Sequence, residues 1–309
     1  MLIDRLISKC VELKNPVCVG LDTSLDYLPE DMQNSCKELT DAAKAITEFN
    51  IKIIDRVHSL IPAVKVQIAY YEMYGVDGIK AFLDTINYAK KMGLIVISDV
   101  KRNDILSTAS CYSSAYLGNV KINGNSFCAF PSDFITVNGY LGTDGISPFI
   151  TDCKEYDKGI FVLVKTSNPS SFELQDKKLD DGQEVYKKMA GFVNFWGKDL
   201  LGKYNYSQIG AVVGATQKSQ AKFLRDKYPN LFFLIPGYGA QGATASDLTV
   251  CFDESGCGGI VNSSRGILCA YKSEKFKSNS YAAAAEDALI DMQQDIYNAL
   301  KNDGKEIRG

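Results

Sequence analysis

The chain has 309 residues, a formal net charge of −3, 46% hydrophobic residues and 23% charged residues. This composition is typical of a globular protein with a sizeable core. The slightly negative charge and the absence of lysine-rich runs argue against a nucleic-acid partner, which requires a basic face. No apolar run approaches about 18 residues, and two charges fall within the first five positions, so we expect neither a membrane span nor a signal peptide.

The cysteines and the histidine exclude several kinds of site. The nine cysteines are scattered, and no two are separated by only two residues, so a zinc knuckle or a thioredoxin-type redox pair is not expected. Reduced thiols in a cytoplasmic protein are the simplest interpretation. The one histidine, His58, lies in a helical pattern and is interpreted as a surface or partly buried helix residue. Multi-histidine metal sites are excluded, and a Ser-His-Asp site would have to use His58.

Short apolar runs alternate with longer helical patterns along the chain. Apolar residues recur at three- and four-residue steps from Asp41 to Leu60 and again over Tyr281–Leu300, which predicts two amphipathic helices. The apolar runs are typical of strands buried on both faces. Eight of them are predicted strands: Val17–Leu21, Ala63–Ile68, Leu94–Val100, Phe134–Val137, Ile160–Lys165, Ile209–Val213, Leu231–Ile235 and Gly259–Asn262.

This alternation belongs to the α/β class and requires a parallel sheet with right-handed crossovers. Eight units favour a closed (β/α)₈ TIM barrel, although an open doubly wound sheet would show the same alternation. The segments Thr108–Ser132 and Thr166–Tyr206 are longer than a minimal barrel needs, so we expect extra helices or loops there. No Pro/Gly/Ser-rich linker divides the chain, and residues 1–309 are predicted to form a single domain.

Charged side chains gather where the second and third predicted strands end, which is the functional end of such a barrel. Residues two apart on a strand point to the same face, so Asp99 and Lys101 are expected to project together, as are Lys65 and Gln67. Asp104 lies just beyond and could add a second carboxylate. Alternating charges let each group stay ionised. Structural ion pairs at the barrel rim would use the same residue types.

The last two predicted strands end in residues suited to an anion. Barrel enzymes frequently bind phosphate at these two loops. The glycine-rich run Pro236–Gly242 lets backbone N–H groups approach an anion, Gln241 adds an amide donor, and Arg265 adds a bidentate fork. After the fifth strand, Lys165–Pro169 supplies hydroxyl and amide groups that suit the edge of a polar heterocycle, although a turn before proline would have the same sequence.

Together these residues resemble the orotidine 5′-phosphate decarboxylase family over nearly the whole chain. The most specific part is the Asp-x-Lys-x-x-Asp-Ile run at Asp99–Ile105, with Thr108 three residues on. Lys65 before it, and Pro236, Gly237, Gln241 and Arg265 after it, complete the pattern in order. Pro62–Lys65 and Asn262–Ile267 resemble the longer bacterial and protozoan branch of that family.

The resemblance implies decarboxylation of orotidine 5′-phosphate to UMP, the last step of pyrimidine nucleotide synthesis, with no cofactor and no metal. It implies that Lys101 faces the reacting carbon and delivers its proton, that Asp99 lies beside the substrate carboxylate, and that Lys65 orders the network. Asp22 would bind a ribose hydroxyl, and the role of Gln67 stays open.

The resemblance also implies a homodimer in which Asp104 and Thr108 reach the substrate of the neighbouring subunit. Ser167 would contact the pyrimidine. The complete set of implied substrate-binding residues is Asp22, Ile105, Thr108, Ser167, Pro236, Gln241, Arg265 and Gly266.

Three other functions use similar residues. A metal-dependent sugar-phosphate decarboxylase or synthase of the same superfamily needs a glutamate where Lys65 stands, and an ammonium would repel the metal. A Schiff-base aldolase would use Lys101 or Lys165, but carboxylates beside Lys101 favour its charged form. A barrel that only binds a nucleotide gives no reason for the array of two lysines and two carboxylates.

Overall fold

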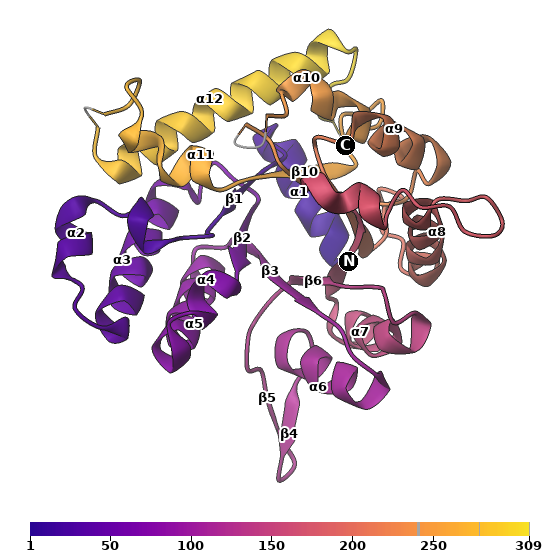
Figure 1. The fold of residues 1–309 in the computed structure, drawn as a ribbon, viewed down its shortest axis with the longest axis horizontal. Helices are drawn as coiled ribbons and strands as arrows, with labels where there is room; N and C mark the ends of the chain where they lie inside the picture. The colour runs from indigo at the N-terminus through magenta and orange to yellow at the C-terminus, as the bar shows by residue number, and fades with distance from the viewer. Residues whose placement is uncertain (240–241, 278, 309) are drawn as a thin grey trace.

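The computed structural model describes residues 1–239, 242–277 and 279–308, and within them eight parallel strands close into a barrel (Figure 1). The strands are hydrogen-bonded in the order β1-β10-β9-β8-β7-β6-β3-β2, which confirms the (β/α)₈ TIM barrel and excludes the open sheet. Their bounds are β1 Val17–Gly20, β2 Ala63–Gln67, β3 Ile95–Arg102, β6 Phe134–Val137, β7 Gly159–Lys165, β8 Ile209–Val213, β9 Phe233–Pro236 and β10 Gly259–Ser263.

Each predicted strand is present, with its ends shifted by at most two residues. The largest shifts are in β3, predicted over Leu94–Val100, and in β9, predicted over Leu231–Ile235. Both strands run further toward their carboxyl ends than the apolar pattern does. The reason is that their last residues are polar or proline and face the open end of the barrel, so hydrophobicity does not mark them.

Helices surround the barrel, with shorter ones between them. The helices that follow or flank strands are α3 Leu39–Val57, α5 Gly75–Lys91, α6 Leu106–Tyr116, α7 Thr143–Tyr156, α8 Val185–Gly197, α9 Lys218–Lys227 and α12 Tyr281–Asn302. The short ones are α2 Glu30–Ser35, α4 Ala69–Glu72, α10 Ala245–Leu248 and α11 Arg265–Leu268. The two amphipathic helices predicted from the sequence are α3 and α12, and they meet where Phe49 stacks on Tyr281 with ring centroids 4.7 Å apart.

The amino-terminal end of the barrel is closed by α1 (Leu2–Leu13). Leu2, Ile3 and Leu6 are fully buried in a cluster with the aromatic rings of Phe134 and Phe161. The Leu2 N–H also donates to Gln208 Oε1 at 2.9 Å. A packed plug at this end leaves the carboxyl ends of the strands as the open face.

The two long segments carry extra elements, as predicted. Residues 108–132 include the end of α6 and an antiparallel hairpin of β4 (Val120–Ile122) and β5 (Asn125–Phe127), which projects from the barrel (Figure 1). Residues 166–206 contain the 3₁₀ turn η2 (Pro169–Glu173) and α8. His58 is a partly buried residue at the end of α3, as predicted. None of the described helices combines the length and the apolar character that a membrane crossing requires.

Candidate active site

A cavity of about 720 Å³ opens at the carboxyl ends of the barrel strands. This volume suits a small-molecule ligand. Many of its lining side chains are charged or polar, and the described lining includes Asp22, Lys65, Asp99, Lys101, Thr136, Ser167, Pro236, Gly237, Asn262 and Arg265. The structure therefore brings together most of the residues that the sequence placed at strand ends.

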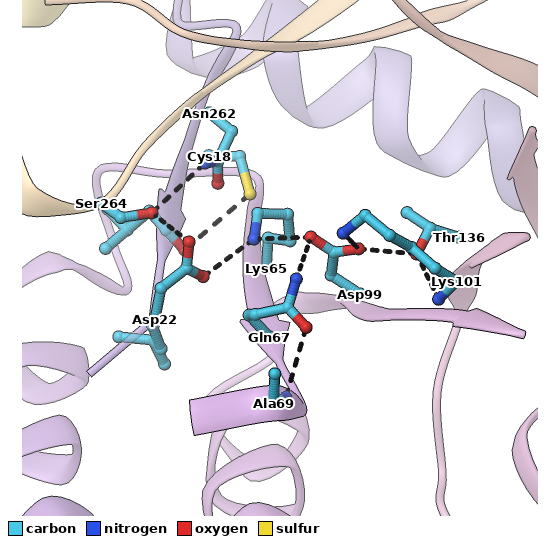
Figure 2. Close-up of polar contacts among 12 residues, drawn as sticks. Cys18, Asp22, Lys65, Gln67, Ala69, Asp99, Lys101, Thr136, Asn262 and Ser264 are labelled. Atoms are coloured by element: carbon cyan, nitrogen blue, oxygen red, sulfur yellow. Dashed lines mark hydrogen bonds and ion pairs between the residues drawn. The ribbon is translucent and has the colours of Figure 1, made fainter. Parts of the chain in front are cut away.

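The base of the cavity holds an alternating chain of charges (Figure 2). The Lys65 ammonium lies 2.8 Å from Asp22 Oδ1 and 3.1 Å from Asp99 Oδ2. The Lys101 ammonium lies 2.6 Å from Asp99 Oδ1. The predicted array of two ammonium groups and two carboxylates is present, but its second carboxylate is Asp22 and not Asp104.

The charges stabilise one another in their ionised forms. Burial alone raises the pKa of Asp99, but the ammonium groups of Lys65 and Lys101 and a hydrogen bond from Thr136 outweigh it and hold that pKa below its usual range. Burial alone lowers the pKa of Lys65, but Asp22 and Asp99 outweigh it and raise that pKa above its usual range. Asp99 is thus an anion and Lys65 a cation at neutral pH.

The backbone of β3 is irregular at the charged residues. Its pairing with β6 shifts register between Ser98 and Arg102, and Lys101 has a φ of 44°. That φ lies in the left-handed region, where a residue with a Cβ is strained. Simple strand alternation was therefore the wrong reason for placing Asp99 and Lys101 together, because a bulge re-aims Lys101.

Thr136 at the end of β6 holds this bulge in place. Its hydroxyl donates to Asp99 Oδ1 at 2.7 Å and accepts the backbone N–H of Lys101 at 3.0 Å. Thr136 was not predicted from the sequence. The signal for it was a threonine, with both donor and acceptor capacity, near the end of the strand that follows β3.

Gln67 has a defined contact in the structure. Its Nε2 donates to Asp99 Oδ2 at 2.9 Å, and its Oε1 accepts the N–H of Ala69 at 3.3 Å. Lys65 and Gln67 therefore project together from β2, as predicted from their spacing, and both donate to Asp99 Oδ2, which was not predicted. Asp99 accepts hydrogen bonds from four side chains, and these bonds fix its orientation in the cavity. The donors are Lys65, Gln67, Lys101 and Thr136.

Residues after β10 extend the chain of contacts beyond Asp22. Ser264 Oγ donates to Asp22 Oδ2 at 2.9 Å, and Asn262 Nδ2 donates to Ser264 Oγ at 3.3 Å. Gly20 on β1 leaves the room for this arrangement, because a Cβ there would lie 2.0 Å from Ser264 Oγ. Neither Asn262 nor Ser264 was predicted from the sequence to have a role in the site.

The phosphate side of the predicted site is formed by β9 and β10. Pro236, Gly237, Tyr238 and Arg265 line the cavity. Gly237 has a φ of 105°, which residues with a Cβ rarely adopt, so the glycine is needed for the turn. The Tyr238 hydroxyl donates to Asp295 Oδ2 on α12 at 2.6 Å and tethers this loop to the last helix. The predicted donor Gln241 lies outside the described residues.

Four predicted site residues do not line the described cavity: Asp104, Ile105, Thr108 and Gly266. Asp104 Oδ1 accepts the N–H of Ile105 at 2.7 Å. Ile105 is 61% exposed. Asp104 lies between the end of β3 and the start of α6, and it does not join Asp99 in the described cavity lining of this subunit.

Lys165 at the end of β7 also differs from what a Schiff-base function requires. It is fully buried, it is absent from the described cavity lining, and its ammonium lies 2.7 Å from Asp176 Oδ1. A Schiff-base lysine needs a neutral amine in contact with the substrate. Lys165 does not line the described cavity, and its amine is paired with a carboxylate.

Comparison with known proteins agrees with the geometry. A model of the orotidine 5′-phosphate decarboxylase / HUMPS family matches residues 15–276. The chain belongs to this family. It is 42% identical to the orotidine 5′-phosphate decarboxylase of Petrotoga mobilis over 297 residues, which cover 96% of this chain and 98% of the relative. It is 43% identical to the enzyme of that name from Clostridium perfringens, with 97% and 99% covered.

This chain is also similar to the solved structure of the OMP decarboxylase of Leishmania donovani, with 26% sequence identity and a TM-score of 0.69. The match covers 95% of this chain and 99% of the Leishmania chain. The similarity therefore extends over the whole barrel and its extra elements, and not over the charged cluster alone.

Proposed function

We propose that this protein decarboxylates orotidine 5′-phosphate to UMP through its Lys/Asp network, without a cofactor. The observation that carries the proposal is the Lys65–Asp99–Lys101 array in a cavity that Gly237 and Arg265 also line. Near-full-length relatives named for this activity support it.

Lys101 is the proton donor in this proposal. The bond between C6 and the carboxylate breaks, CO₂ leaves, and the electron pair stays on C6. A proton from Lys101 Nζ then forms the new C6–H bond, and the lysine is reprotonated from solvent. Its side chain is 46% exposed and points at the cavity from the bulge, so the ammonium can reach both substrate and water.

Asp99 and Lys65 prepare the site electrostatically. Asp99 is held as an anion beside the position of the substrate carboxylate, and Lys65 fixes Asp99 and Asp22 relative to each other. A charge pair at about 4 Å supplies about 4 kcal/mol at an effective dielectric of 20, whereas enzymes lower barriers by roughly 8–23 kcal/mol. No single contact suffices, so the whole preorganised array is required.

The distant phosphate supplies binding energy for the reaction. Arg265, the turn at Gly237 and Pro236 line the cavity and are suited to hold it. Gln241 and Gly266 are assigned as further donors from the sequence resemblance. Ser167 and Asp22 both line the cavity. In this proposal Ser167 contacts the edge of the pyrimidine, and Asp22 accepts a hydrogen bond from a ribose hydroxyl. Binding energy gained at a remote group lowers the barrier only when it is used to close and order the site.

We further propose a homodimer in which Asp104 and Thr108 complete the neighbouring site. Ile105 and Leu106, which lie between them, are 61% and 54% exposed, and such side chains gain from burial against a second subunit. Residues 1–309 act as one domain. All nine cysteines are free, which suits a cytoplasmic protein with reduced thiols.

The test is the loss of orotidylate absorbance with purified protein in the presence of EDTA, with UMP identified by chromatography. Rapid conversion without added metal is expected. Dependence on magnesium, together with turnover of a sugar phosphate, would support the metal-dependent branch of the family instead. Borohydride trapping of a covalent adduct would support a Schiff-base reaction.

A further inference from the structure

The segment after β7 is held by contacts that a minimal barrel lacks. We propose that Lys165, Thr166, Gln175 and Asp176, here called the clasp, position Ser167 and so set the selectivity of the cavity for a uracil-type ring. The inference rests on the proposed function, because it concerns the heterocycle of that substrate. The clasp residues are positioning residues, and only Ser167 is assigned a direct contact with the ring.

The ion pair of the clasp joins the strand end to the inserted segment. Lys165 Nζ donates to Asp176 Oδ1 at 2.7 Å and to Ser171 Oγ at 3.2 Å, and it lies 5.8 Å from the ring centroid of Tyr186. The Lys165 side chain is fully buried. A buried ammonium that loses its carboxylate is costly, so the pair holds Asp176 firmly against β7.

Gln175 continues the clasp next to the ion pair. Its Oε1 accepts the backbone N–H of Thr166 at 2.9 Å, and its Nε2 donates to Thr166 Oγ1 at 2.7 Å. Thr166 Oγ1 in turn donates to Asn168 Oδ1 at 2.6 Å. The residues on both sides of Ser167 are therefore fixed by side chains, and the inserted segment provides the decisive contacts.

Gly214 at the end of β8 closes the other side of Ser167. Its N–H donates to Lys165 O at 2.7 Å, and a Cβ on Gly214 would lie 2.8 Å from the N, Cα and Cβ atoms of Ser167. Gly214 is not among the glycines with a positive φ, so an alanine there would change the space and not the backbone preference. Ser167 is thus held between Gly214 and the clasp.

The wall that results presents hydroxyl and amide groups to the cavity. Thr166, Ser167, Asn168 and Gln175 line it together. Groups fixed in this way can distinguish rings by the donors and acceptors along their edge, since a mismatched polar group is left unpaired. Uracil and cytosine differ at the 4-position and at N3, so UMP and CMP are suitable probes of this wall.

The test compares three variants with the wild-type protein. D176N removes the charge that pairs with Lys165. G214A adds a methyl group that is too close to Ser167, on the side away from the clasp. D181N is the matched control, because Asp181 belongs to the same inserted segment but is exposed: its Oδ2 lies 3.7 Å from Lys188 Nζ, and its Oδ1 accepts the N–H of Gln183 at 3.0 Å, a bond that asparagine can keep. Steady-state kinetics with orotidylate give KM and kcat, and calorimetry gives the Kd of UMP and CMP.

We expect D176N and G214A to raise the KM for orotidylate and the Kd of UMP about tenfold, which corresponds to about 1.4 kcal/mol. The kcat should change far less, and the Kd of CMP should stay near its wild-type value, so the preference for UMP falls. D181N should match the wild type. Equal weakening of UMP and CMP, or unchanged KM in both test variants, would overturn the proposal.

A second variant and a binding measurement separate loss of folding and loss of the reaction from loss of ring selectivity. If D176N does not fold, as judged by circular dichroism, G214A alone decides, because it leaves the ion pair intact. Nucleotide binding is measured without turnover, so it tests the clasp separately from the reaction. A wild-type protein that binds UMP in preference to CMP but does not decarboxylate orotidylate would refute the proposed reaction. The binding comparison of the variants would then still decide the role of the clasp.

Discussion

The Lys101 ammonium lies 2.6 Å from Asp99 Oδ1, although the Lys101 backbone has a φ of 44°. A residue with a Cβ in the left-handed region costs roughly 1–2 kcal/mol. The strained residue is the one proposed to deliver the proton. The bulged backbone places the Lys101 ammonium at the cavity, and two hydrogen bonds of the Thr136 hydroxyl hold the bulge in this conformation.

Replacement of Lys101 separates strain from function. K101G removes the Cβ that opposes the left-handed backbone, whereas K101A keeps it, so K101G should be more stable than K101A by about 1 kcal/mol. Urea unfolding at neutral pH measures the difference. A K101G variant that is no more stable than K101A would show that the bulge is not strained.

Thr136 should contribute to turnover through Asp99. T136V keeps the size of the side chain but removes the donor to Asp99 and the acceptor for the Lys101 N–H. A hydrogen bond to a charged group is worth about 1.5–3 kcal/mol, so kcat should fall roughly 10- to 150-fold while KM changes little. T136S retains the hydroxyl and serves as the control. A T136V variant with wild-type kcat would argue against this role.

The charge network should affect acid stability in a defined direction. The pKa of Asp99 is depressed in the folded state, so its contribution is fully present above its unfolded value of about 3.9 and is lost as pH falls toward the folded pKa. The wild type should therefore lose stability relative to D99N as the pH drops below about 4. Urea unfolding at several pH values tests this. A stability difference that does not depend on pH would contradict the depressed pKa.

Subunit mixing tests the shared site. K101A and D104A should each be nearly inactive as homodimers. In a mixed dimer one site receives Lys101 from one chain and Asp104 from the other, so random exchange should restore about a quarter of the wild-type activity. The measurement is activity after co-refolding of the two variants. No recovery, with mixed dimers demonstrated, would show that Asp104 does not act across the interface.

The sequence predicted the barrel because eight apolar runs alternate with amphipathic helices, and it predicted the charged cluster because parallel strands end at one face. It did not predict the bulge at Lys101 or the contacts of Thr136, since neither leaves a periodic signal. Asp104 was placed in the wrong cluster because closeness in sequence does not show which way the chain turns after a strand. The partners of Lys165 were also missed, because Asp176 reaches it through an irregular segment.

The most direct test of the central claim is the steady-state rate of orotidylate decarboxylation by K101A. UMP binding by calorimetry confirms that the variant retains its cavity. General acid catalysis alone is worth about 10²–10⁴-fold, so kcat/KM should fall by at least about a hundredfold with UMP still bound. A K101A variant that keeps its activity within tenfold of the wild type would contradict the assignment of Lys101 as the proton donor.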